Sequence, residues 1–150
     1  MQGYGFPGTY TTNDLPGCPD NGGLLSGTDG PDKLDGRDGE DEIHGLGAAD
    51  VIFGGADNDA IYGGPGDERL LVGGEGEDVI YGGDGDDDFY AGDLGKDTLY
   101  GGAGDDLLVA TMDGQKDKRY CGEGRDHYDA DKGDYVSSSC EEKQKRSPIP

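Results

Sequence analysis

The sequence predicts an all-β solenoid, in which short parallel strands alternate with glycine-rich turns. Three observations predict this fold class. Glycine recurs with a nine-residue period, an acidic residue stands at the sixth position of each period, and an apolar residue stands at the eighth position of most periods. Repetition at a fixed short period is typical of solenoids, because each repeat buries its apolar side chains only against its neighbours.

Eleven repeats run from Gly27 to Asp129. In order they read GTDGPDKLD, GRDGEDEIH, GLGAADVIF, GGADNDAIY, GGPGDERLL, GGEGEDVIY, GGDGDDDFY, GDLGKDTLY, GGAGDDLLV, MDGQKDKRY and CGEGRDHYD. In this layout the residues left over between repeats are Val72, Ala91, Ala110 and Thr111. We expect each repeat to form a six-residue turn and a three-residue strand, so that two repeats make one coil.

Each repeat position has its own physical requirement. Positions one, two and four are mostly glycine, which adopts the positive φ angles of tight turns and lets carbonyl groups approach a common point. The acidic residues at position six are Asp32, Asp41, Asp50, Asp59, Glu68, Asp78, Asp87, Asp97, Asp106, Asp117 and Asp126. The apolar residues at position eight, which we expect to point into the core, are Leu34, Ile43, Ile52, Ile61, Leu70, Ile80, Phe89, Leu99 and Leu108.

The charge of the chain restricts its partners. Among 150 residues, 34 are acidic and 12 are basic, which gives a net charge of −22. Such a chain repels nucleic acid and anionic membrane surfaces, and no apolar run is long enough to insert into a membrane. Cations are therefore the expected partners.

The repeats resemble a known calcium-binding family. Segments 73–81, 82–90 and 101–109 match the pattern GGxGxDxUx at every defined position, where U is a large apolar residue. They resemble the RTX (repeats-in-toxin) nonapeptide family, and the resemblance extends in register over 27–129. It implies a parallel β-roll with calcium ions in its turns.

The resemblance also implies the calcium ligands. In that family, the position-six carboxylates of repeats two apart share one ion, and turn carbonyl groups complete its shell. The carboxylate pairs would be Asp32 with Asp50, Asp41 with Asp59, Asp59 with Asp78, Asp78 with Asp97, Asp87 with Asp106 and Asp106 with Asp126. Glu68 would pair with Asp50 and with Asp87, and the neighbouring Asp67 is the alternative to its longer side chain. The carbonyl ligands would come from Gly54, Gly55, Gly63, Gly64, Gly73, Gly74, Gly82, Gly83, Gly101 and Gly102.

Calcium suits this composition. It takes six to eight oxygen ligands, and up to about nine ions would neutralise most of the net charge of −22. Without calcium, carboxylates stacked at the inter-strand spacing of about 4.8 Å would repel one another, and the glycine-rich turns would lose much entropy on ordering. We expect calcium binding and folding to be one event.

Two other interpretations of the acidic repeats fit less well. Disorder would not explain why an apolar residue recurs at a fixed distance after each acidic residue. An EF-hand loop needs an oxygen ligand at its third position, but in the loop that would begin at Asp50 this position is Ile52.

The ninth position predicts two exposed columns, because alternate repeats fall on the same sheet. One column holds His44, Tyr62, Tyr81, Tyr100 and Tyr120. The other holds Asp35, Phe53, Leu71, Tyr90, Val109 and Asp129. The tyrosines either stabilise their own strands by cross-strand packing or form a docking face for a protein, a glycan or a second copy. The sequence favours neither alternative decisively.

The cysteines and the chain ends complete the domain plan. The segment from Cys121 to Cys140 resembles the closing segment of small secreted bacterial calcium-repeat proteins, which implies a disulfide that pins a cap over 130–140. Cys18 is left over, either free or bridged to another chain. We expect an N-terminal cap or leader over 1–26 and a flexible tail over 141–150.

The predicted function is that of a secreted, non-enzymatic calcium-binding module of bacterial origin. A Cys121–His127 catalytic pair would need an orienting third group and a pocket, and every well-placed carboxylate already belongs to a metal turn. The alternatives are an adhesion or interaction module that uses the tyrosine column, and an accessory domain of a secreted enzyme or toxin.

Overall fold

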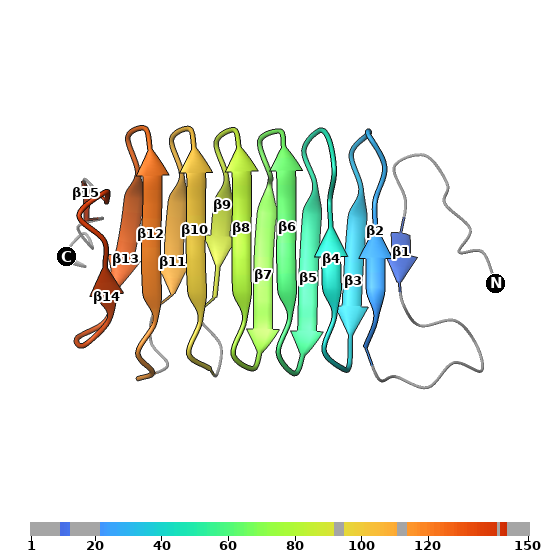
Figure 1. Ribbon diagram of the computed structural model, residues 1–150, viewed down its shortest axis with the longest axis horizontal. Coiled ribbons are helices and arrows are strands. Elements are labelled where there is room, and N and C mark those ends of the chain that lie inside the picture. The colour runs from blue at the N-terminus through green and yellow to red at the C-terminus, as the bar shows by residue number, and fades with distance from the viewer. Residues whose placement is uncertain (1–9, 13–21, 92–94, 111–113, 141, 144–150) are drawn as a thin grey trace, which may run out of the picture.

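The structure is a computed structural model that describes residues 10–12, 22–91, 95–110, 114–140 and 142–143. Within these residues the chain forms two parallel sheets, and successive strands alternate between them (Figure 1). The strands are β1 (Tyr10–Thr12), β2 (Leu24–Ser26), β3 (Lys33–Arg37), β4 (Glu42–His44), β5 (Val51–Ala56), β6 (Ala60–Pro65), β7 (Leu70–Glu75), β8 (Val79–Asp84), β9 (Asp88–Tyr90), β10 (Thr98–Ala103), β11 (Leu107–Ala110), β12 (Lys118–Glu123), β13 (His127–Ala130), β14 (Tyr135–Val136) and β15 (Glu142–Lys143).

The odd-numbered strands form an eight-stranded sheet in the order β1 to β15, and the even-numbered strands form a seven-stranded sheet from β2 to β14. Each strand pairs in parallel with the strand two further along the chain, as in β6 with β8, where Ile61 lies opposite Ile80. The molecule is thus a β-solenoid in which two repeats make one coil, as the sequence predicts. Figure 1 shows the even-numbered sheet in front.

The core is a single file of apolar side chains between the sheets. Because strand side chains alternate in direction, one residue per strand points inward between two outward neighbours. The fully buried residues of the file are Leu34, Ile43, Ile52, Ile61, Leu71, Ile80, Phe89, Leu99 and Leu108, with Ala91, Ala110 and Cys121 beside them. Such a narrow core buries little apolar surface per residue.

One repeat differs from the predicted layout. Leu71, not Leu70, lies in the core opposite Ile52, and Val72, not Leu71, lies between Phe53 and Tyr90 in the exposed column. The extra residue is Arg69, whose amide bonds to the Asp50 carbonyl oxygen just before the strand begins. Inserting a residue there keeps Glu68 level with Asp50 and restores the register one residue later.

The solenoid also extends beyond the predicted range of 27–129. At one end, β2 pairs with β4 and buries Leu25 in the core. At the other end, β14 pairs with β12, so residues 130–140 add a further turn to the solenoid. The backbones of β1 and β15 continue the odd-numbered sheet at its two ends. The rest of segments 1–21 and 141–150, including Cys18, lies outside the described residues.

Within the part of the chain that the structure describes, no helix has the length and hydropathy that a membrane span requires.

Candidate metal centre

The position-six acids form two ladders, one along each edge of the solenoid. In each ladder the backbone N–H of one acid donates to the Oδ1 atom of the acid two repeats later. The donor–acceptor distances are 2.9 Å for Asp32 to Asp50 and for Asp41 to Asp59, 2.8 Å for Asp59 to Asp78, 2.9 Å for Glu68 to Asp87, for Asp78 to Asp97, for Asp87 to Asp106 and for Asp97 to Asp117, and 3.0 Å for Asp106 to Asp126. The structure therefore brings together the six predicted aspartate pairs and Glu68 with Asp87, and it adds the pair of Asp97 with Asp117.

Glu68 interrupts its ladder. Neither of its carboxylate oxygens has a hydrogen-bond partner, so the Asp50–Glu68 rung lacks the bond that the other rungs make. The extra methylene carries the carboxylate past the backbone amide that an aspartate reaches. Asp67 does not replace it, because Asp67 is exposed and its Oδ1 accepts the Asp86 amide at 2.9 Å on the outer side of the turn.

The ladder acids are removed from water. All eleven are between 0 and 7 % exposed. The second oxygens of Asp50, Asp59, Asp87 and Asp106 have no hydrogen-bond partner. A buried, unsatisfied carboxylate oxygen is costly, so these atoms indicate that a cation belongs beside them.

The pKa values of these carboxyl groups show the same cost. Burial, followed by the nearby ladder carboxylates, raises the pKa of Asp59 and of Asp106 to about 7. Burial, opposed by the Asp32 amide, raises the pKa of Asp50 to about 6. Burial and the facing Asp87 raise the pKa of Glu68 to about 10. In the absence of a cation, these groups therefore release their protons at a higher pH than ordinary carboxyl groups do.

Oxygen atoms from successive coils converge beside the position-one glycines. A Cβ atom built on Gly54 would lie 2.5 Å from both Asp59 Oδ2 and the Gly73 carbonyl oxygen. A Cβ on Gly45 would lie 2.5 Å from Asp50 Oδ2 and 2.6 Å from the Gly63 carbonyl oxygen. Any side chain would fill this space, so glycine keeps carboxylate and carbonyl oxygens available to an ion. Calcium prefers such hard oxygen donors, at about 2.3 to 2.6 Å.

Nine of the ten predicted carbonyl ligands, all except Gly74, fall into two groups. The carbonyl oxygens of Gly54, Gly63, Gly73, Gly82 and Gly101 lie beside position-one glycines of the preceding coil, where the ladder carboxylates also lie. Those of Gly55, Gly64, Gly83 and Gly102 lie against the position-two glycine of the next coil. The φ angle of 117° at Gly55 is one that residues with side chains rarely adopt.

No group of three or more His, Cys, Asp or Glu side chains that could hold a metal occurs among the described residues. This agrees with the ladder geometry, because each space contains carboxylates from only two repeats and draws its other oxygens from the backbone.

Sequence reasoning missed an outer ladder on the exposed side of the turns. The amide of Asp105 donates to Asp86 Oδ1 at 2.7 Å, and the amide of Arg125 donates to Asp105 Oδ1 at 2.8 Å. The frequent aspartate at repeat position five was the signal that could have revealed it. These side chains hold successive turns together and are not part of the buried ladders.

Sequence reasoning also missed how one ladder ends. The Asp117 amide donates to Asp134 Oδ1 at 3.2 Å, so Asp134 continues the ladder. Arg119 occupies the inward position eight and is fully buried. Its Nη1 lies 3.1 Å from Asp134 Oδ2, its Nη2 lies 3.9 Å from Asp117 Oδ2, and Nη2 also donates to the Ala110 carbonyl oxygen.

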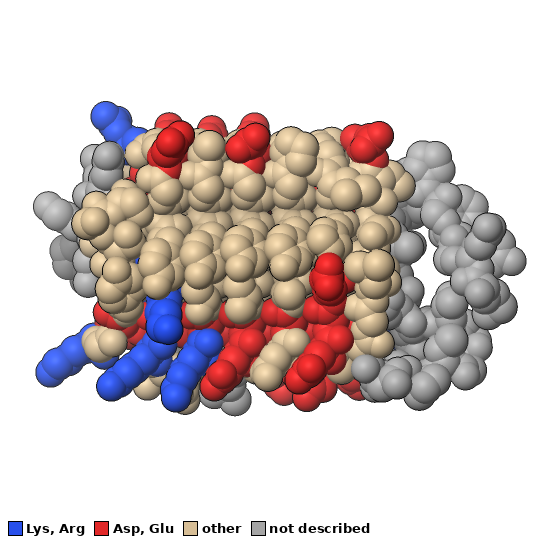
Figure 2. Space-filling view, in the orientation of Figure 1, with Lys and Arg blue, Asp and Glu red and all other residues tan. Residues whose placement is uncertain are grey.

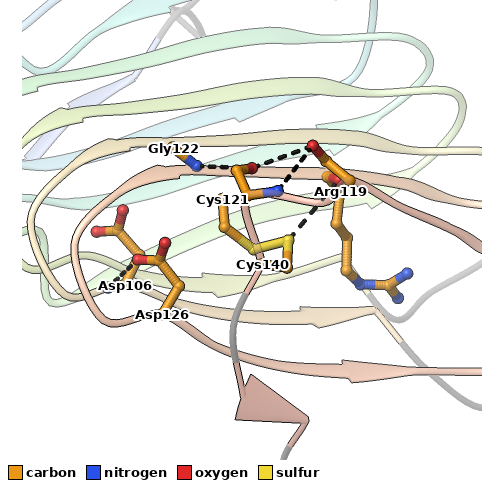
Figure 3. The surroundings of a disulfide bond; sticks show 8 residues. Asp106, Arg119, Cys121, Gly122, Asp126 and Cys140 are labelled. Carbon is orange, nitrogen blue, oxygen red and sulfur yellow. Dashed lines mark hydrogen bonds between the residues drawn. A yellow bond between two sulfur atoms is a disulfide. The ribbon is translucent and has the colours of Figure 1, made fainter.

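The predicted cysteine pair lies next to this arginine. The sulfur atoms of Cys121 and Cys140 are at disulfide distance, and the Cys140 sulfur lies 3.9 Å from the Arg119 carbonyl oxygen (Figure 3). Cys121 is fully buried. This geometry leaves no accessible thiol at Cys121 to act with His127.

The predicted tyrosine column is a continuous stack on the front sheet. Ring centroids are 4.7 Å apart for His44 and Tyr62, 5.0 Å for Tyr62 and Tyr81, 4.7 Å for Tyr81 and Tyr100, and 4.9 Å for Tyr100 and Tyr120. Tyr135 follows at 5.5 Å with a tilt of 46°. We call residues 44, 62, 81, 100 and 120 the tyrosine ladder.

The solenoid and its buried acidic ladders define a repeat protein built to hold cations between its coils. A comparison with protein families identifies these repeats. The model of the RTX calcium-binding nonapeptide repeat matches in four copies, over residues 22–51, 36–70, 62–94 and 88–111. The matches cover more than half of the chain, which therefore belongs to the RTX calcium-binding repeat family. Neither the curated proteins nor the solved structures contain a match.

Proposed function

We propose that this chain is a secreted calcium-binding protein, without catalytic activity, whose β-roll folds as calcium fills the two acidic ladders. The observation that supports this best is the set of buried ladder carboxylates with unpartnered oxygens at Asp50, Asp59, Asp87 and Asp106. Each would receive an ion shared with the neighbouring coil, and the proposed total is up to about nine ions.

The proposed ligands are the eleven predicted acids. Asp134, which follows Asp117 in its ladder, is not among them, because its Oδ2 lies 3.1 Å from Arg119 Nη1. The carbonyl oxygens of Gly54, Gly63, Gly73, Gly82 and Gly101 are the favoured backbone ligands, because they lie beside the ladder carboxylates. Bound calcium would supply the positive charge that stabilises adjacent coils against carboxylate repulsion.

An extracellular location follows from the same chemistry. A chain that needs calcium to fold would stay unfolded where calcium is scarce and would fold where it is abundant. We also propose that Cys121 and Cys140 form a disulfide, which requires an oxidising compartment. Export would thus precede folding.

The absence of catalysis is proposed on two grounds. The well-placed carboxylates stand in the ladders, and Cys121 is buried next to Cys140. A second candidate function is an interaction module, which the exposed tyrosine ladder favours. A role as an accessory part of a secreted enzyme or toxin is also compatible with these repeats.

A calcium titration followed by far-UV circular dichroism tests the proposal. Metal-stripped protein is expected to show a cooperative coil-to-β transition with calcium and none with magnesium. A chain that is β-rich in chelator, or one that stays disordered in millimolar calcium, would contradict the folding switch.

A matched pair of variants localises the sites. Asp59→Asn removes a charge that serves two rungs, because Asp59 accepts from the Asp41 amide and donates to Asp78. We expect this variant to bind about two fewer ions by isothermal titration calorimetry and to need more calcium to fold. Asp38→Asn removes the same charge at an exposed turn position and should match the wild type.

A further inference from the structure

The centre of the front sheet presents a flat, uncharged face. Its outward side chains come from the tyrosine ladder and from the neighbouring column of Ala60, Val79 and Thr98. On the other side of the ladder, the outward positions are occupied by Gly64, Gly83, Gly102 and Gly122. Tyr62 and Tyr81 are each 36 % exposed. Figure 2 shows this face as a broad band of uncharged side chains.

The ladder presents ring edges, not ring faces. Neighbouring rings from His44 to Tyr120 are within 9° of parallel, at centroid distances of 4.7 to 5.0 Å. Each interior ring therefore has both faces covered by its neighbours. A sugar ring that needs to stack on an aromatic face finds none available among these interior rings, whereas another flat sheet can pack against the edges.

The lower margin of this face is divided by charge. Along the even-numbered strands and the turns that precede them, the half near β4 and β8 has the exposed acidic residues Asp38, Glu40, Glu42, Asp57 and Glu77. The half near β10 and β12 has three exposed basic residues, Lys96, Lys116 and Lys118. Figure 2 shows acidic groups along this margin toward the β2 end and basic groups toward the β14 end.

The charged margin of one copy is complementary to the same margin of a second copy when a particular two-fold axis relates the two copies. A two-fold axis parallel to the strands, passing near β8, would place the front sheets of two copies face to face with their solenoid axes reversed. The lower margins would then coincide. Glu42, whose Oε1 also lies 2.7 Å from His44 Nε2 of its own chain, would lie opposite Lys118 of the other copy. Glu40 and Lys116 would meet in the same way. A two-fold axis along the solenoid would bring Lys118 opposite Glu123, at the other end of β12, but would place no basic residue of the described even-numbered strands opposite Glu40 or Glu42. The charge pattern therefore favours the first orientation.

The area of the face is compatible with a weak dimer. Six spacings between seven strands give about 29 Å along the solenoid, and the six residues of the longest strands, β6, β8, β10 and β12, give about 20 Å. The resulting area is at most roughly 600 Å² per copy, below the standard of about 800 Å² per partner. The expected dimer is therefore a weak one.

We infer that the calcium-loaded protein forms an antiparallel two-fold homodimer through its front sheet, with the tyrosine ladders packed against each other and Glu42 paired with Lys118. This goes beyond the proposed calcium function. Calcium is required because it orders the face and because it reduces the net charge of −22 that keeps metal-free chains apart.

Sedimentation equilibrium in saturating calcium tests the dimer, with circular dichroism on the same samples to show that the β-roll has formed. Glu42→Lys and Lys118→Glu each replace an attraction by a repulsion at two symmetry-related places. We expect each variant to dimerise at least about tenfold more weakly than the wild type. Asp88→Lys makes the same charge change as Glu42→Lys but on the back sheet, and should dimerise like the wild type.

Mixing the two variants gives the decisive result. A copy with Glu42→Lys and a copy with Lys118→Glu are complementary at both contacts, so their equimolar mixture should regain dimer that neither forms alone. A folded, calcium-loaded wild type that stays monomeric at millimolar concentration overturns the inference. So does a dimer that both variants leave unchanged.

If either variant fails to fold, the wild type still provides a test, because its dimer should disappear in chelator and weaken as salt screens the charge pairs. A dimer that is insensitive to salt contradicts the proposed orientation. Loss of the β-roll itself in calcium would contradict the proposed function, and circular dichroism distinguishes that failure from loss of the dimer.

Discussion

The central rungs and the C-terminal coil place buried acids in the same backbone geometry, but the C-terminal acids face a basic side chain that neutralises their charge. In the central rungs, the second oxygens of Asp59 and Asp106 have no hydrogen-bond partner. In the C-terminal coil, the guanidinium of Arg119 lies 3.1 Å from Asp134 and 3.9 Å from Asp117. A ladder of stacked carboxylates needs a cation, and at this end the chain supplies one of its own. We expect the C-terminal coil to depend least on calcium.

Replacing Arg119 should have the largest effect on the stability of the C-terminal coil. Arg119→Met leaves Asp117 and Asp134 buried without their partner, and breaking a buried ion pair costs about 3 to 5 kcal/mol. Urea denaturation at limiting calcium is expected to show a loss of this size. Arg119→Lys keeps the charge but not the planar fork, so it should lose less. Equal stability of Arg119→Met and wild type would mean that the arginine does not stabilise this coil.

The cysteine pair is expected to contribute the next largest effect. The two residues are 19 apart in sequence, and closing a loop of that length stabilises a fold by roughly 3 kcal/mol in the chain-entropy model. Cys121→Ser with Cys140→Ser should raise the calcium concentration needed for folding and lower the urea midpoint. Cys18→Ser controls for thiol removal. A double variant that folds at the wild-type calcium concentration would contradict a stabilising role for the cysteine pair.

Acidification should stabilise the central rungs without calcium. The pKa values of Asp50, at about 6, and of Asp59 and Asp106, at about 7, are above the ordinary value of 3.8. The folded state therefore binds more protons than the unfolded state between these values. This contribution is fully present below about pH 4 and is lost as the pH rises through 6 to 7.

Metal-stripped protein should consequently gain β structure as the pH falls from 7.5 to 4.5, as measured by far-UV circular dichroism without added calcium. In saturating calcium, bound ions replace the protons and the signal should change little over the upper part of this range. A metal-free chain whose β content falls on acidification would refute the link between ladder charge and folding.

Glu68→Asp should give the smallest change. Shortening the side chain restores the acid found at the other predicted rungs and lets its oxygen reach the Asp50 amide. Gaining one hydrogen bond contributes about 1 kcal/mol, so the calcium midpoint for folding should fall slightly. Calorimetry would show whether the affinity of the weakest sites rises. An unchanged midpoint would mean that the glutamate rung binds calcium as well as the aspartate rungs do.

The nine-residue period predicted the alternation between two sheets, the inward position eight and the outward tyrosines, because all three follow from strand geometry and a constant turn length. It did not place the extra residue at Arg69. A one-residue insertion can stand at any point between two matching repeats, and only the parallel register shows that Leu71 is the core residue.

The ends of the solenoid were harder to predict for a different reason. The segment around Asp134 lacks the glycines of positions one and two, and the segment around Leu25 lacks the acid of position six. The first segment keeps the position-six acid, Asp134, and the second keeps the position-eight apolar residue, Leu25, so neither matches the whole repeat pattern. Arg119 was visible as an exception to an apolar column, but sequence alone does not show that Asp134 comes within 3.1 Å of it.

The regular spacing of the tyrosine ladder also has an optical consequence. Aromatic rings held parallel at 4.7 to 5.0 Å exchange excitation energy and couple their electronic transitions, which separated rings in an unfolded chain do not. The chain contains no tryptophan, so no stronger chromophore masks this signal. Near-ultraviolet circular dichroism and the anisotropy of tyrosine emission would therefore report assembly of the front sheet in the native sequence, with no label attached.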